Sequence, residues 1–258
     1  MPATAFQHFH DDISRAWAIT NHAHALPTAT PAEQLLRSDL LRSGWMFAVG
    51  ALDAYFCDAY TDIVAATIIS KTRHPAMVIP DFFQKIKFPV RAFLEEYDVN
   101  ENWKWRMAAR EMMAKENVLS LEEIQSLFKK FLRPQHRFFQ DVLESWITHA
   151  NAKRRVFGIA RAAYIATPEP DRAAARTAAW SRMEDRYQEI FQRRHDCIHN
   201  CDRPRVAPQP LNRRGTVLKV IEDVEFLVER SDEHIQVEFR HFLLGCHCPP
   251  AIVAQAGY

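Results

Sequence analysis

The stretch LLRSGWMFAVGALDAYFCDAY, residues 40–60, decides the fold class. Its apolar side chains recur every three or four residues, which is the period of one face of an α-helix. The pattern includes Leu41, Trp45, Ala48, Leu52, Tyr55, Ala59 and Ile63. We therefore expect one long helix, from Pro31 to about Ser70, at the centre of a helical bundle.

Other segments carry similar helix signals. Thr30 and Glu33 form a capping-box pattern before the long helix, and Ser120 with Glu123 repeats it further along the chain. Periodicity and caps predict further helices at about 1–26, 100–115, 120–133, 136–149, 153–167, 170–200, 216–229 and 233–244. Glycine is scarce, at 6 of 258 residues, whereas sheets use it at turns and bulges. The predicted class is all-α, a multi-helix bundle with two long central helices.

The length of 258 residues suits one large domain or two small ones, and we expect a single helical domain over 1–258. Three prolines between residues 75 and 89 break the pattern after the first long helix. We interpret about 71–150 as a helical insertion. The last residues, about 245–258, are expected to form a flexible tail.

Charge and composition narrow the function classes. The formal net charge is +1, so any contact with nucleic acid must come from a local patch. Five cysteines, an odd count, do not suggest a disulfide framework. The most apolar segment contains Asp53, Asp58 and Asp62, which argues against a membrane span. The N-terminus lacks the basic and apolar regions of a signal peptide, so we expect a cytoplasmic protein.

The segment RRHDCIHN, residues 193–200, is the main candidate for chemistry. Arg194 lies four residues from both Ile190 and Ile198, so it interrupts the apolar stripe of its helix. A buried arginine needs an acidic partner, a subunit interface or a phosphate ligand. The simpler alternative is an arginine at a helix end that extends its charged group into water.

Arg194 and His199 together could cleave RNA without a metal ion. Histidine moves protons near neutral pH, and an arginine fork stabilises a phosphoryl transition state. Positions five residues apart on an ideal helix point in directions that differ by about 140°, so the two side chains diverge. Either the helix ends or distorts between them, or the site combines residues from two protomers of a two-fold dimer.

The segment Arg194–His199 resembles the R-x4–6-H signature of the HEPN superfamily, and His195 takes the place of the polar residue that follows the arginine. RRHDCIHN is similar to the RRHxIVHN form of bacterial members, with Cys197 replacing an aliphatic residue. The ALDAY core of residues 40–60 is similar to the long first helix of RiboL-PSP-like HEPN families.

The resemblance implies a dimeric helical bundle that acts as a metal-independent endoribonuclease without a cofactor, in toxin–antitoxin or antiphage defence. The implied partners are RNA, a second copy of the chain, and an antitoxin or defence protein. The resemblance does not imply binding to a membrane. The implied catalytic pair is Arg194 and His199, supported by His195, Asp53, Arg193 and Asn200. Asp53 is implied as the acid that orients the arginine, although acids at such positions are more often simply exposed. The alternative is a non-catalytic HEPN-like module that binds RNA or acts as a scaffold.

The loop at 202–215 is rich in proline and arginine. Its candidates for phosphate contact are Arg203, Arg205, Arg213 and Arg214. The alternative is a solvated loop without a ligand.

A zinc site is a rival hypothesis for the same segment. The candidate ligands are His195, Cys197, His199 and Cys201, with Cys246, His247 and Cys248. Alternate residues on a helix point about 200° apart, so the first four side chains cannot surround one ion. We therefore expect no metal at this segment.

Overall fold

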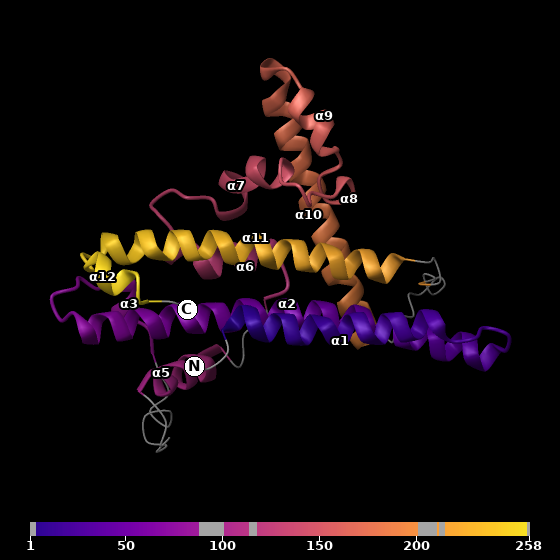
Figure 1. Ribbon diagram of the computed structural model, residues 1–258, viewed down its shortest axis with the longest axis horizontal. Coiled ribbons are helices and arrows are strands. Elements are labelled where there is room, and N and C mark those ends of the chain that lie inside the picture. Colours follow the sequence, from indigo (N-terminus) through magenta and orange to yellow (C-terminus); the bar gives the residue numbers. More distant parts are fainter. Residues whose placement is uncertain (1–3, 88–100, 114–117, 201–210, 212–214, 257–258) are drawn as a thin grey trace.

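The computed structural model describes residues 4–87, 101–113, 118–200, 211 and 215–256. All regular elements in these ranges are helices, which confirms the predicted all-α class. Figure 1 shows three long helices, α1, α2 and α11, that run side by side, with α10 standing across them.

The central helix α2 spans Pro31–Arg73, close to its predicted bounds. It begins at the predicted capping box, because the Thr30 hydroxyl accepts from the Glu33 N–H and the Glu33 carboxylate accepts from the Thr30 N–H. Two long helices, α1 (Ala5–Ala25) and α11 (Thr216–Gly245), pack against α2. Its apolar face is therefore buried inside the bundle, as predicted.

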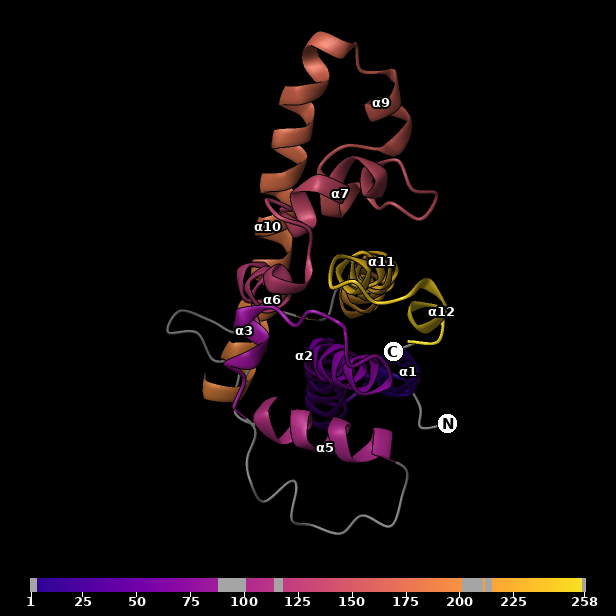
Figure 2. The same cartoon turned by 90° about the vertical axis from the view of Figure 1, so that its left-hand side faces the viewer.

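The second long helix, α10, spans Glu169–Asn200 and matches its predicted range. Its first half extends beyond the three parallel helices and forms an arm with shorter helices (Figures 1 and 2). These are α7 (Phe138–Ile147), α8 (Arg154–Phe157) and α9 (Arg161–Ala166). A single helix was expected at 153–167, but Gly158 adopts φ 73° and ends α8.

The region expected as an insertion contains α3 (Asp81–Gln84), α5 (Glu101–Met113), α6 (Leu121–Phe128) and a 3-10 turn, η1 (Lys129–Phe131). Figure 2 shows α5 on the side of α2 that faces away from α11. There the buried Asp62 of α2 accepts hydrogen bonds from Arg106 of α5, at 2.8 Å for Nη2. These contacts attach the region to the central helix.

Helix α11 corrects the prediction of two helices at 216–229 and 233–244. It continues without a break through Ser231 and Asp232, which are buried. Asp232 accepts a hydrogen bond of 2.9 Å from the Tyr55 hydroxyl and one of 2.7 Å from Gln236. The polar side chain of Asp232 thus lies in the core of the bundle, where Tyr55 of α2 supplies its partner.

The C-terminal segment differs from the flexible tail that was expected. Residues 250–253 form the short helix α12 (Pro250–Val253), and Cys246 and Cys248 are buried. The Cys246 carbonyl accepts a hydrogen bond of 2.8 Å from the Val78 N–H. The segment thus packs against the chain that follows α2.

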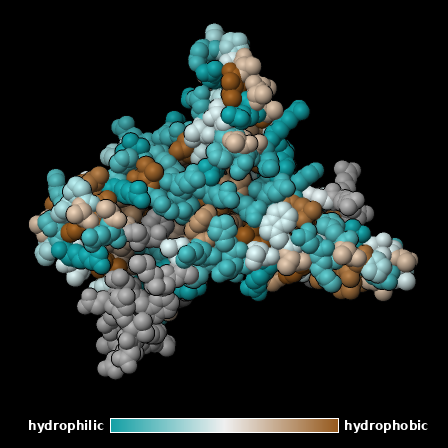
Figure 3. All heavy atoms as spheres, in the orientation of Figure 1, coloured by the Kyte–Doolittle hydropathy of each residue, from teal (hydrophilic) through white to brown (hydrophobic). Residues whose placement is uncertain are grey.

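The visible surface is largely hydrophilic, with hydrophobic side chains among polar ones at the end where α1 joins α2 (Figure 3). Leu35 and Leu36 are exposed in that part of α2, by 63% and 52%. Within the described ranges, none of the helices has the length and apolar character needed to cross a membrane.

Candidate functional site

The end of α10 that carries the arginine–histidine segment lies against α2 (Figure 2). The Trp45 indole N–H in α2 donates a buried hydrogen bond of 3.0 Å to the main-chain carbonyl of Ile190. Helix α10 then continues to Asn200. The helix therefore does not end between Arg194 and His199.

Asp53 lies beside this crossing. Its Oδ1 atom accepts a hydrogen bond of 2.7 Å from the Val118 N–H, in the segment before α6. Burial raises the pKa of Asp53, and the Val118 hydrogen bond and the positive charge of Arg194 partly oppose that rise. The charge of the predicted arginine is thus near enough to act on the pKa of the predicted acid. Among the described atoms the two side chains share no hydrogen bond or ion pair within 4 Å.

The two adjacent arginines occupy different environments. Arg193 is 8% exposed and counts among the buried charged residues, whereas Arg194 is half-buried. Ile190 is fully buried and Ile198 is 47% exposed, so the apolar stripe of α10 ends between them. Arg194 was expected to interrupt that stripe, but Arg193 is the more deeply buried of the two arginines.

A cavity of about 470 Å³ lies between α10 and the start of α6. Its polar lining includes His195, Glu184, Glu122, Gln188 and Gln192. Burial, followed by the nearby Asp185, raises the pKa of Glu184. His195 was predicted as a supporting residue, but the cavity was not predicted, because the start of α6 is distant in the chain.

Several predicted site residues are not placed. The backbone of His199 and Asn200 belongs to α10, but their side chains lie outside the description. Arg203, Arg205, Arg213 and Arg214, the expected phosphate contacts, also lie outside the described residues.

The proposed cysteine ligands of the rival zinc site do not come together where they are described. Cys197 is half-buried in α10, while Cys246 and Cys248 are buried beside α12. Figure 1 shows α12 at the opposite end of α11 from the α10 crossing. Burial, together with Cys248, raises the pKa of the Cys246 thiol to about 11, so it stays protonated near neutral pH.

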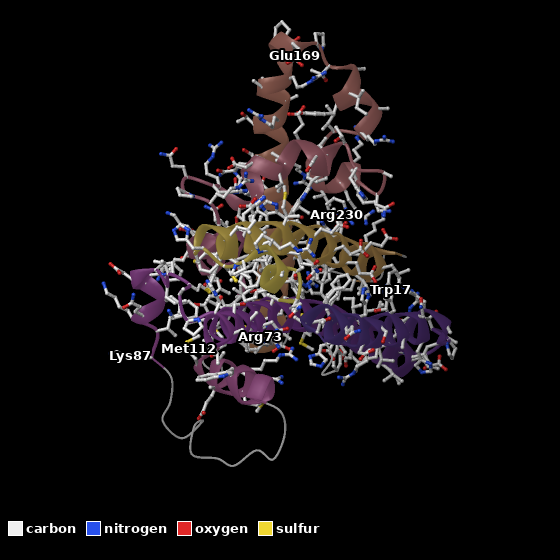
Figure 4. All side chains as sticks on the ribbon, turned by 60° about the vertical axis from the view of Figure 1, so that its left-hand side comes forward. Trp17, Arg73, Lys87, Met112, Glu169 and Arg230 are labelled. Atoms are coloured by element: carbon white, nitrogen blue, oxygen red, sulfur yellow. The ribbon has the colours of Figure 1, made fainter. Side chains whose placement is uncertain are left out.

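A buried ion-pair cluster fixes the arm to α11. Asp223 is fully buried and accepts hydrogen bonds of 2.8 Å from Arg155 Nε and 2.9 Å from Arg186 Nε. Figure 4 shows Arg230 at the base of the arm, where its Nη1 atom lies 3.1 Å from His149 Nε2. These contacts keep α7, α8 and α10 in place on α11 and so position the far end of α10.

Comparisons with protein-family models, curated proteins and solved structures gave no match for this chain.

Proposed function

We propose that this protein is a metal-independent endoribonuclease of the HEPN type. The observation that carries the proposal is the position of Asp53 beside the crossing of α10 and α2, where the positive charge of Arg194 acts to lower the pKa of this half-buried acid. We infer that this carboxylate attracts the guanidinium group of Arg194 toward the crossing. A guanidinium group there is suited to a phosphate, which it binds through two hydrogen bonds.

The proposed reaction needs no external nucleophile. The ribose 2′-hydroxyl attacks the adjacent phosphorus, a bond to the 2′ oxygen forms, and the bond to the 5′ oxygen breaks. The products are a 2′,3′-cyclic phosphate and a 5′-hydroxyl end. His199 takes the proton from the 2′-hydroxyl or gives one to the leaving oxygen, and Arg194 stabilises the charge on the pentavalent phosphorane.

The unbroken end of α10 favours a site built by two protomers. On a regular helix, positions five residues apart point about 140° away from each other, so we infer that the arginine and the histidine at one phosphate come from different chains. A two-fold dimer that pairs the ends of α10 brings an arginine of one protomer next to a histidine of the other.

The charges near the cavity limit where RNA is held. Glu122 and Glu184 line the cavity and repel a polyanion when ionised. We therefore assign phosphate binding to Arg194, and further backbone contacts to the arginine-rich loop at 202–215. His195 follows Arg194 in the chain and lines the cavity, and we assign it a role in shaping the site.

The test is RNA cleavage in the presence of EDTA. We expect wild-type protein to cleave and Arg194→Ala and His199→Ala to lose cleavage by roughly 100-fold or more while remaining folded. Arg182→Ala is the matched control, because Arg182 is a partly exposed arginine of the same helix whose partner is Glu189. RNA binding without cleavage by wild-type protein would support the non-catalytic alternative instead.

A mixing experiment tests the two-protomer site. Arg194→Ala and His199→Ala subunits are inactive separately, but a mixed dimer contains one position with an intact arginine and an intact histidine. We expect co-expressed variants to regain part of the wild-type activity. Failure of complementation in proven heterodimers would place both groups in one chain.

The biological role follows from the same proposal. A small endoribonuclease that needs no cofactor must be restrained in the cell that makes it. A toxin–antitoxin or antiphage role, with a partner protein that controls the activity in the cytoplasm, meets that requirement.

A further inference from the structure

A second cluster of chemically active side chains lies away from the α10 crossing, between α11 and the loop before α7. It contains His136, His234 and Glu238, each with one potential ligand atom within 4.8 Å of the others. His234 and Glu238 are four residues apart on α11, so they share a face of that helix. His136 approaches from the loop, where Gln135 adopts φ 67° and reverses the chain.

We propose that His136, His234 and Glu238 bind a divalent transition-metal ion of the zinc class. Two imidazoles and one carboxylate are a ligand set that zinc uses with a fourth, open position. Imidazole ligands do not suit magnesium or calcium, which prefer oxygen.

The distances between the three side chains suit a bound ion after small rotations of those side chains. The Nε2 atom of His136 lies 3.8 Å from Glu238 Oε1, and the two imidazole ring centres are 4.8 Å apart. Ligand atoms about 2.0–2.2 Å from a tetrahedral zinc ion are roughly 3.4 Å from each other. The cluster is thus slightly wider than the occupied site would be.

The second ring nitrogen of His136 supports the assignment. Its Nδ1 atom lies 3.4 Å from Asp141 Oδ2, without the geometry of a hydrogen bond, while Nε2 faces Glu238. Metal-binding histidines commonly point their other ring nitrogen at a carboxylate, which orients the ring. The side chain of His136 is only 7% exposed, so this orientation is fixed by packing.

The cluster also contains buried polar atoms that need a partner. In the described part of the chain, the Nε2 atom of His234 is buried and makes no hydrogen bond. An imidazole nitrogen that has no partner within the described part of the chain is available to a metal ion.

Arg133 is the competitor for Glu238. It donates hydrogen bonds of 2.6 Å to Oε1 and 3.0 Å to Oε2, and its side chain is 58% exposed. A cavity of about 520 Å³ lined by these residues leaves space at the open side of the cluster. Arg133 thus binds the Glu238 carboxylate from the solvent side. A cation that enters the site must share this carboxylate with Arg133 or displace the arginine.

The test uses untagged full-length protein, freed of metal with EDTA and titrated with Co²⁺ as a coloured substitute for Zn²⁺. We expect one ion per chain with the visible absorption of a four-coordinate site, and displacement of the colour by Zn²⁺. His136→Gln and His234→Gln should each weaken binding roughly 10-fold or more, with unchanged circular dichroism. His149→Gln, a histidine near the same helix but outside the cluster, should bind like wild type.

Three results would overturn the proposal. Wild-type protein would bind neither Co²⁺ nor Zn²⁺, or both folded glutamine variants would bind as tightly as wild type. Loss of binding in Cys197→Ser would also overturn it, because the ion would then lie at the α10 segment. Arg133→Ala should bind several-fold more tightly, and equal or weaker binding would exclude Glu238 as a ligand. Because RNA cleavage is assayed in EDTA, failure of the metal site and failure of the nuclease proposal remain distinguishable.

Discussion

The Trp45 indole N–H in α2 hydrogen-bonds, at 3.0 Å, to the main-chain carbonyl of Ile190 in α10. In a regular helix that carbonyl also accepts from the N–H four residues on, which belongs to Arg194. Trp45 and Ile190 are 5% and 0% exposed, so the bond is shielded from water. One tryptophan therefore anchors the turn of α10 that carries both arginines.

Replacement of this tryptophan should weaken the fold and the candidate site together. Trp45→Phe keeps an aromatic ring but removes the donor, so we expect a loss of about 1–2 kcal/mol in the free energy of unfolding, measured with urea. RNA cleavage should fall as well. Trp17→Phe is the matched control, because Trp17 donates to Glu225 of α11 and should affect stability alone. Wild-type stability in Trp45→Phe would contradict the assignment.

The buried cluster at Asp223 should be far more sensitive than a surface pair. Asp223→Ala leaves Arg155 and Arg186 without their shared carboxylate, and breaking such a buried pair costs about 3–5 kcal/mol. Asp39→Ala removes an exposed pair with Arg42 and should cost less than about 1 kcal/mol. Urea unfolding of both variants measures the difference. Similar losses in the two would show that burial does not decide the energetics here.

The pH dependence of stability should reveal the buried charge of Glu225. Burial raises the pKa of Glu225, and the Trp17 hydrogen bond only partly opposes that rise. The folded state therefore binds a proton more readily than the unfolded state, and this contribution to stability is lost as the pH rises through the folded pKa. The free energy of unfolding of Glu225→Gln relative to wild type should therefore increase as the pH rises from about 4, where an unfolded glutamate titrates, through the raised pKa of the folded state. A difference that is constant across this range would contradict the prediction.

The helix pattern was predictable wherever the deciding signals are local. The capping box at Thr30 and the apolar period of α2 are both contained in a few turns of chain. The division of α11 was wrong because Asp232 finds its partner Tyr55 in a distant helix. A polar residue in a sequence does not show whether a distant segment provides a hydrogen bond.

The candidate sites were predictable only in part for the same reason. Local spacing selected Arg194, and the resemblance paired it with Asp53, which the structure places within its electrostatic reach. The histidine cluster joins His136 to a face of α11 far along the chain. Its only local signal, His234 four residues before Glu238, is common in helices and did not indicate a site.

Two glycines of α2 should respond in opposite ways to alanine. A Cβ atom at Gly44 would lie 2.2 Å from the Oγ1 atom of Thr20 in α1, whereas Gly50 has open space at the same position. We expect Gly50→Ala to stabilise by about 0.5–1 kcal/mol and Gly44→Ala to destabilise by about 1–3 kcal/mol. Thermal or urea unfolding measures both. Adding Thr20→Ala should recover part of the loss in Gly44→Ala, and absence of recovery would place the clash elsewhere.

The proposed role of Asp53 can be separated from its structural role by removing only its charge. Asp53→Asn keeps an oxygen that accepts from the Val118 N–H, so the segment before α6 should stay in place. The electrostatic contact with Arg194 is lost, and we expect RNA cleavage to fall about 10-fold or more while the free energy of unfolding changes by less than about 1 kcal/mol. Asp39→Asn, on the same helix but exposed, should cleave like wild type. Undiminished cleavage by folded Asp53→Asn would show that Arg194 does not need this acid.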